Sequence, residues 1–135
     1  MVEKNKRGDF SLPNLPYTII SIDLGETTGV ASYELLSRAL RCTATQHFQQ
    51  LFPLLVLLRP NEILLERFPG KHALDYSIEI AYRQLAMKSI LISPSEWKPF
   101  MQTKKKKFDH AETQHEKDAI NMLRYYMITT LGRDI

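Results

Sequence analysis

The sequence is poor in the features that mark several common protein classes. Cys42 is its single cysteine, which excludes an intrachain disulfide and a zinc site built from cysteine thiolates. No stretch approaches the roughly 18 consecutive apolar residues that a membrane-spanning helix needs. The lysines near the N-terminus are not followed by the apolar segment of a secretory signal. We therefore expect an intracellular protein in a reducing compartment.

What is present fits one globular domain that carries cationic stretches. The 135 residues, 44% apolar and 24% charged, are enough for one hydrophobic core but not for two. The net charge of +3 favours an anionic partner only weakly, but the cations are unevenly distributed. They gather near the N-terminus (Lys4, Lys6 and Arg7) and in the run from Lys104 to Lys107, as a phosphate-contacting surface would require. Taken alone, the lysine run is equally well explained as a solvated loop.

Hydrophobic periodicity predicts an alternation of strands and helices after a flexible basic arm at residues 1–16. Within the domain of residues 17–135, strands are predicted at 17–24, 30–36, 39–47, 62–68 and 89–93. Helices are predicted at 48–58, 73–87 and 110–131, with a loop through Pro94, Trp97 and the lysine run before the last helix. This order implies an α/β domain with a five-stranded mixed sheet, three antiparallel strands followed by parallel ones, flanked by helices. It is the order expected of the ribonuclease H-like fold.

Acidic residues lie at three positions where the predicted strands and the last helix could bring them together. Asp23 lies in an apolar strand, and Glu66 closes the run that forms the next core strand. Asp118 and His115 are three residues apart, so they share one face of the last helix. Each has an ordinary structural explanation as well. Asp23 could cap the following turn, Glu66 could form a surface ion pair with Arg67, and His115 could be an exposed residue of a first helical turn.

Taken together, these residues predict a site for divalent cations. Hard cations take carboxylate oxygens from separate elements, and two ions about 3.5–4 Å apart share one ligand. Asp23 is the expected shared ligand, with Glu66 on one ion and Asp118 and His115 on the other. Two Mg²⁺ or Mn²⁺ ions would activate a water for in-line attack on a phosphodiester, so no protein nucleophile is required. The sequence accordingly has no nucleophile elbow, no Walker loop and no zinc motif.

The same motifs, in the same order, resemble those of the RuvC-type Holliday junction resolvases over roughly residues 17–131. Residues 22–29 (Ile-Asp-Leu-Gly-Glu-Thr-Thr-Gly) resemble the first strand of that family, and residues 64–68 (Leu-Leu-Glu-Arg-Phe) the segment with its catalytic glutamate. Residues 115–119 (His-Glu-Lys-Asp-Ala) resemble its C-terminal acidic motif. The resemblance implies that the catalytic and metal-binding residues are Asp23, Glu66, His115 and Asp118.

The resemblance also implies a mode of DNA binding. Residues 94–98 (Pro-Ser-Glu-Trp-Lys) resemble a stretch of phage-like members, and Phe68 is placed like a residue that wedges into the junction, although core packing would explain it equally well. The expected DNA contacts are Lys98, Lys104, Lys105, Lys106, Lys107, Arg67, Phe68, Lys71 and Arg83. The family is homodimeric, so a homodimer is implied, with the predicted helix at 73–87 as its surface. Between Trp97 and His115 the chain is shorter than in bacterial members, which leaves open how the junction arms are gripped.

The sequence thus predicts a crossover junction endodeoxyribonuclease, a metal-dependent hydrolase that cuts four-way DNA junctions symmetrically in recombination, repair or branched-DNA processing. We expect it in the cytoplasm or at the nucleoid, without a membrane or nucleotide cofactor. The sequence does not distinguish between a bacterial, phage or organellar origin.

Three other hypotheses share parts of this pattern. The motif around Asp23 also resembles the phosphate-binding loop of sugar kinases, actin and heat-shock chaperones, but those proteins need two such domains. A YqgF-type nuclease linked to ribosomal RNA maturation has the same fold and a similar length, but a glycine-proline stretch is expected there in place of Glu66. A non-catalytic nucleic-acid-binding module would lack one of the metal ligands.

Overall fold

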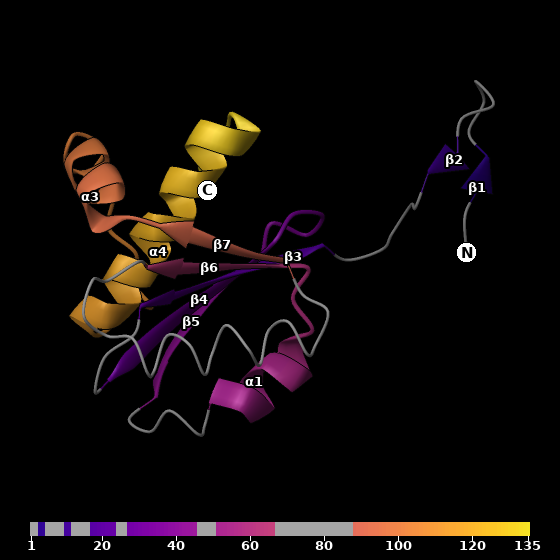
Figure 1. The fold of residues 1–135 in the computed structure, drawn as a ribbon, viewed down its shortest axis with the longest axis horizontal. Coiled ribbons are helices and arrows are strands. Elements are labelled where there is room, and N and C mark those ends of the chain that lie inside the picture. Colours follow the sequence, from indigo (N-terminus) through magenta and orange to yellow (C-terminus); the bar gives the residue numbers. More distant parts are fainter. Residues whose placement is uncertain (1–2, 5–9, 12–16, 24–26, 46–50, 67–87) are drawn as a thin grey trace.

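The core of the protein is one five-stranded mixed sheet (Figure 1). This computed structural model describes residues 3–4, 10–11, 17–23, 27–45, 51–66 and 88–135. The strands are β3 (Thr18–Asp23), β4 (Thr28–Glu34), β5 (Leu40–Thr45), β6 (Glu62–Glu66) and β7 (Lys88–Ile92), and they lie side by side in the order β5-β4-β3-β6-β7. The first three pair antiparallel, whereas β6 runs parallel to β3 and β7 parallel to β6. The predicted arrangement of the sheet is therefore confirmed.

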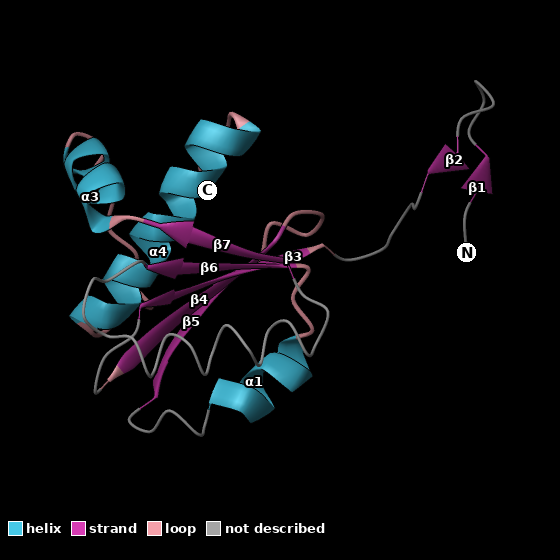
Figure 2. Cartoon of the chain, viewed as in Figure 1, coloured by secondary structure: helices cyan, strands magenta, loops and turns pink. Residues whose placement is uncertain are grey.

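Helices cover both faces of this sheet, as Figure 2 shows. Helix α1 (Leu51–Leu58) lies on one face. On the other lie α3 (Pro94–Gln102) and α4 (Gln114–Tyr126), which continues as the π-helix η2 (Met127–Leu131). None of the helices in the described ranges is long and apolar enough to cross a membrane.

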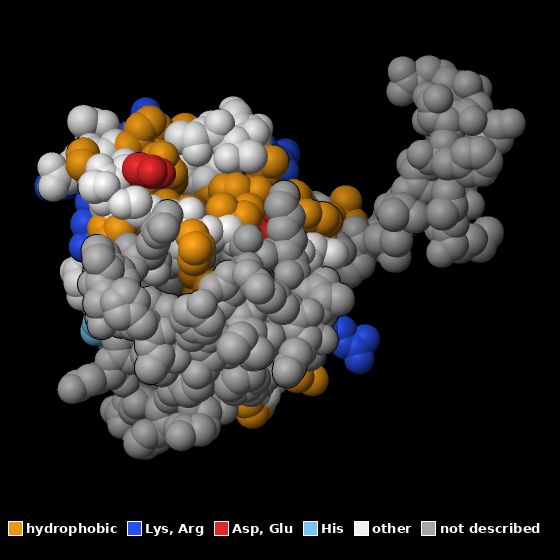
Figure 3. Space-filling model, in the orientation of Figure 1, with side chains coloured by type: hydrophobic (Ala, Val, Ile, Leu, Met, Phe, Trp, Pro, Cys, Tyr) orange, Lys and Arg blue, Asp and Glu red, His pale blue; other side chains and the backbone are white. Residues whose placement is uncertain are grey.

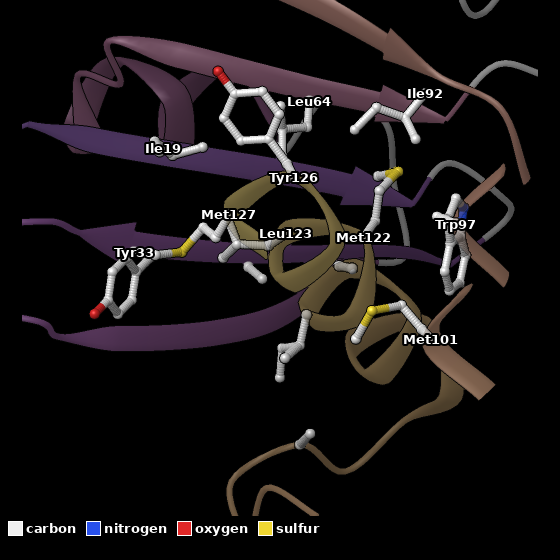
Figure 4. Packing of buried hydrophobic residues seen from close by; sticks show 14 residues of the cluster. Ile19, Tyr33, Leu64, Ile92, Trp97, Met101, Met122, Leu123, Tyr126 and Met127 are labelled. Carbon is white, nitrogen blue, oxygen red and sulfur yellow. The ribbon is translucent and has the colours of Figure 1, made fainter. Parts of the chain in front are cut away.

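Strand β3 is at the centre of the sheet and is buried on both faces, which explains its nearly continuous apolar sequence. Because side chains alternate between the faces of a strand, Ile19 joins the cluster under α4, while Ile20 and Ile22 join the cluster under α1. Figure 4 shows the first of these clusters, in which Leu123 and Met127 pack on the strands. The two clusters pack against the sheet from its two faces, and the strands in turn position the residues at their ends.

The largest departure from the predicted elements is α3, because a loop was predicted over these residues. The chain forms a helix here because Pro94 occupies its first turn, where a missing N–H is tolerated, and because Trp97 and Met101, one turn apart, are both buried. The last helix begins at Gln114 rather than at residue 110. Its start is set by Thr113, whose side chain and backbone pair with Glu116 in a capping box.

Several predictions fall wholly or partly outside the described residues. These are the helix at 73–87 with its proposed dimer surface, the last residues of the strand at 62–68, and the first residues of the helix at 48–58. In the predicted N-terminal arm, β1 (Glu3–Lys4) and β2 (Phe10–Ser11) pair antiparallel. The flexibility of that arm remains a prediction.

Candidate active site

Two carboxylates meet at one edge of the sheet because two parallel strands end there. Strand β6 runs parallel to β3 with Leu65 opposite Ile22, so the next residues, Glu66 and Asp23, close neighbouring strands at the same edge. Asp23 is 6% exposed and Glu66 2% exposed. Burying two acidic side chains side by side is unfavourable unless polar or positive partners accompany them.

Helix α4 brings His115 onto Asp23. The Nδ1 atom of His115 lies 3.0 Å from Oδ2 of Asp23, across 92 positions of sequence. This approach depends on Gly29, which pairs with Asp23 across β3 and β4. A Cβ atom on Gly29 would lie 2.1 Å from the backbone oxygen of His115, so only glycine lets the first turn of the helix come this close.

The other acidic residues of the first helical turns have distinct surroundings. Asp118 is half-buried and accepts a 2.8 Å hydrogen bond from Nε2 of Gln114. Glu116, which lies between His115 and Asp118, is buried in the capping box instead. Burial opposes its ionisation, but hydrogen bonds involving Cys42 and Thr113 outweigh this effect and keep the pKa of Glu116 below its ordinary value. Glu116 therefore has a structural role, and Asp118 is the acid that is available to the site.

Glu66 is held from the side by α3. The indole Nε1 of Trp97 donates a 3.0 Å hydrogen bond to its Oε2 atom, while its Oε1 atom is buried with no hydrogen-bond partner among the described residues. Burial raises the pKa of Glu66 to about 7, and the negative charges of Asp23 and Asp118 add to this rise, against Lys98 and the indole, which lower it. The carboxylates of Asp23, Glu66 and Asp118 thus act on one another, and we call this group the acidic corner.

The donor types fit a hard divalent cation, which prefers carboxylate oxygens and tolerates an imidazole. The unpartnered Oε1 of Glu66 and the repulsion between its carboxylate and those of Asp23 and Asp118 both favour a cation among them. No three of the His, Cys, Asp and Glu side chains that the structure describes, however, stand together as a ready-made metal site. The predicted site residues are brought to one edge of the sheet, but among the described residues the side chains do not stand close enough together to form a complete set of metal ligands.

The predicted DNA-contacting residues are described in part. Lys98 is exposed on α3, and its Nζ atom lies 5.5 Å from the centre of the Trp97 ring. Lys104, Lys105 and Lys107 are exposed beyond the end of α3, and Figure 3 shows cationic side chains around this part of the molecule. Lys106 instead donates a 2.6 Å hydrogen bond to the backbone oxygen of Ile135. The remaining four predicted contacts, Arg67, Phe68, Lys71 and Arg83, lie outside the described residues.

An open hollow of about 810 Å³ lies beside the lysine run. Its walls include Lys105, Lys107 and Lys117, with Met101 and Phe108 as apolar parts of its lining. Gln114 also lines the hollow and bonds to Asp118, so the hollow adjoins Asp118.

The sequence analysis missed the parts played by Trp97 and Gly29. For Trp97 a signal existed: Ser93-Pro94-Ser95-Glu96 has the serine, proline and glutamate spacing that is typical of a helix start. A helix there would have placed Trp97 on its inner face. For Gly29 no local signal distinguishes a glycine that is needed for a turn from one that allows a helix to pack closely against the strand.

Searches against family models and curated proteins found no match. Among solved structures, T. thermophilus RuvC in complex with a Holliday junction substrate has a TM-score of 0.55 and 14% identity, covering 84% of this chain and 96% of RuvC. The fowlpox virus resolvase, solved with Holliday junction DNA, has a TM-score of 0.45 and 15% identity, over 83% of this chain and 76% of the resolvase. A chain of a simian T-cell lymphotropic virus intasome has a TM-score of 0.40 and 16% identity, over 69% of this chain and 40% of that chain.

The similarity to T. thermophilus RuvC, at 14% identity, bears on the fold alone. The order of the strands and the similarity to T. thermophilus RuvC over most of both chains show that this protein has the ribonuclease H-like fold.

Proposed function

We propose that this protein is a metal-dependent, structure-selective endonuclease that cleaves four-way DNA junctions. The observation that carries the proposal is the meeting of Asp23, Glu66 and the His115–Asp118 turn of α4 at one edge of a ribonuclease H-like sheet. Carboxylates buried together at strand ends have no packing role of their own, whereas phosphodiester hydrolysis by divalent cations needs such a cluster.

Within this site the chain has identifiable tasks. Asp23, Glu66, Asp118 and His115 would hold Mg²⁺ or Mn²⁺, two ions per site, and the cations would supply an activated water and stabilise the leaving oxygen. The hydrogen bond between His115 and Asp23 orients the carboxylate that both ions would share. Lys98, exposed on α3 with its charge acting on Glu66, would contact a phosphate beside the scissile one.

The proposed substrate follows from the fold and the charge. T. thermophilus RuvC, with which this chain shares its fold, was solved with a Holliday junction. The lysines beyond α3 offer a surface for the DNA backbone. A homodimer with two sites would cut two opposing strands of the junction. The competing proposals are an RNA-directed nuclease of the YqgF kind and a binding module for branched nucleic acid without catalysis.

A direct test is cleavage of a synthetic mobile four-way junction in Mg²⁺, beside linear duplex, flap and single-stranded RNA. We expect paired symmetric nicks in the junction alone and their loss in Asp23→Asn, by several orders of magnitude. Glu34→Gln is the matched control, because Glu34 is at the opposite end of the sheet, paired with Thr18. Binding without cutting in the unmodified protein would favour the binding module, and cutting of RNA would favour the YqgF-like nuclease.

A further inference from the structure

Trp97 is a buried residue of α3 that contacts the acidic corner through Glu66. It is the only tryptophan of the chain, it is 3% exposed, and its indole N–H bonds to a glutamate that is itself 2% exposed. A buried indole N–H needs an acceptor, and many backbone oxygens could serve. Here the acceptor is the side chain of Glu66, one of the proposed metal ligands, 31 positions away.

The indole has little freedom to point elsewhere. Trp97 packs in the cluster that contains Ile92 at the end of β7, Met101 one turn later on α3, and Met122 on α4. Figure 4 shows the Trp97 ring beside Met101 and Met122. Because each of these neighbours is buried, the direction of the N–H is determined by the packing of three elements rather than by Trp97 alone.

The consequence for Glu66 is an asymmetry between its two oxygens. Oε2 is engaged by the indole, whereas Oε1 is buried and has no hydrogen-bond partner among the described residues. A carboxylate that is free at both oxygens can rotate and bind a cation through either or both of them. With Oε2 held by the indole, the carboxylate cannot rotate freely, and Oε1 is the oxygen left without a hydrogen-bond partner among the described residues.

We propose that Trp97 is a positioning residue that holds the Glu66 carboxylate by Oε2 and thereby presents Oε1 to a divalent cation. The inference rests on the proposed function in so far as that cation belongs to the nuclease site. It assigns to α3 a task beyond packing: the helix carries Trp97 inward to the ligand and Lys98 outward to solvent.

The first experiment uses the indole itself. A single tryptophan gives a single indole cross-peak in an ¹⁵N–¹H spectrum of the full chain, and its proton shift reports the strength of its hydrogen bond. In Glu66→Gln we expect the indole proton to move upfield, because a neutral amide oxygen is a weaker acceptor than a carboxylate. Mg²⁺ should move the peak of the unmodified protein and leave that of Glu66→Gln in place. An indole peak that Glu66→Gln does not move would overturn the proposal.

The second experiment removes the donor. Trp97→Phe keeps an aromatic ring but loses the N–H, and we expect its affinity for Mg²⁺, measured by calorimetry, to fall about 10- to 100-fold, as for other groups that orient a metal ligand. Met127→Ala is the control, since it removes buried volume from the same cluster at the end beside Tyr33, away from Trp97 (Figure 4). Equal losses of affinity in the two variants would overturn the positioning role. Should Trp97→Phe fail to fold, the indole shift in Glu66→Gln still decides.

The two proposals fail in different ways. An indole that responds to Glu66→Gln and to Mg²⁺, in a protein that cuts no nucleic acid, would support the role of Trp97 and contradict the nuclease. Junction cleavage by a protein whose indole signal does not change in Glu66→Gln would support the nuclease and contradict the role of Trp97.

Discussion

Glu66 shows how a residue's chemistry depends on its surroundings. An exposed glutamate is ionised throughout the neutral range, but here burial, together with the charges of Asp23 and Asp118, raises its pKa from 4.5 to about 7. A carboxylate whose pKa is raised in the folded protein favours folding at low pH, because the folded state binds the proton more tightly than the unfolded state does.

The first prediction is therefore a pH dependence of stability in the metal-free protein. The free energy of unfolding should fall as the pH rises from about 4.5 to 7, by on the order of 3 kcal/mol from Glu66 alone. Urea unfolding in the presence of a chelator, at pH 5 and pH 8, measures it. Glu66→Gln should lose this part of the dependence and be the more stable protein at pH 8. The prediction is wrong if both proteins lose stability equally over that range.

At the scale of elements, the site depends on how α4 meets β4. The helix begins where the Thr113–Glu116 capping box sets it, and its first turn lies against the backbone of Gly29. The contact joins a strand and a helix far apart in sequence, and it places His115 within hydrogen-bonding distance of Asp23. The packing of this one turn thus decides whether His115 and Asp118 reach the carboxylates of Asp23 and Glu66.

We predict that Gly29→Ala separates the helix from the sheet. The added Cβ atom would meet the backbone oxygen and carbon of His115 at 2.1 and 2.2 Å, and neither can move without moving the helix. The variant should be less stable by about 1–3 kcal/mol, as for other overpacked cores, and should lose cleavage activity. Urea unfolding and the junction assay measure the two effects.

Gly132→Ala provides the comparison for this variant. Gly132 has a φ of +74° at the end of η2, with nothing within 4 Å of an added Cβ, so its substitution strains the backbone but meets no neighbour. It should lower stability while leaving cleavage intact. If Gly29→Ala cleaves junctions as well as Gly132→Ala does, the close approach of α4 is not needed for the site.

For the molecule as a whole, the uneven distribution of charge matters more than the net charge of +3. The carboxylates of Asp23, Glu66 and Asp118 lie together, and the lysines beyond α3 adjoin them through Gln114, which bonds to Asp118 and lines the hollow beside the lysine run. An arrangement of this kind would hold the DNA backbone beside the acidic corner while the bound cations offset its negative charge.

This arrangement predicts binding to junction DNA that weakens steeply with salt. Each phosphate contact should contribute about 0.9 log units of affinity per tenfold change in salt. Replacing Lys105 and Lys107 together by glutamine should therefore reduce the slope of log affinity against log salt concentration by roughly two such contributions. Fluorescence anisotropy with an uncleaved junction in Ca²⁺ or chelator provides the measurement.

Arg59→Gln is the control, because Arg59 precedes β6 and so lies toward the opposite end of the sheet from Glu66. Its slope should equal that of the unmodified protein. Binding that hardly changes with salt would show that the lysine run does not contact DNA.

Much of this protein could be predicted from local sequence. The apolar runs and their spacing predict the order of the strands, and that order, with the similarity to T. thermophilus RuvC, gives the ribonuclease H-like fold. The placement of Asp23 and Glu66 followed as well, because parallel strands that are neighbours end at the same edge of a sheet. These inferences succeed since they depend only on periodicity and on rules of strand connection.

The contacts that complete the site were decided by tertiary structure alone. The Asp23–His115 hydrogen bond joins residues 92 positions apart, and the Glu66–Trp97 bond joins residues 31 apart. Both depend on how closely and at what angle a helix lies on the sheet, which the packing of many side chains determines together. A glycine at position 29 and a tryptophan at position 97 are visible in the sequence, but their tasks exist only once α4 and α3 are in place.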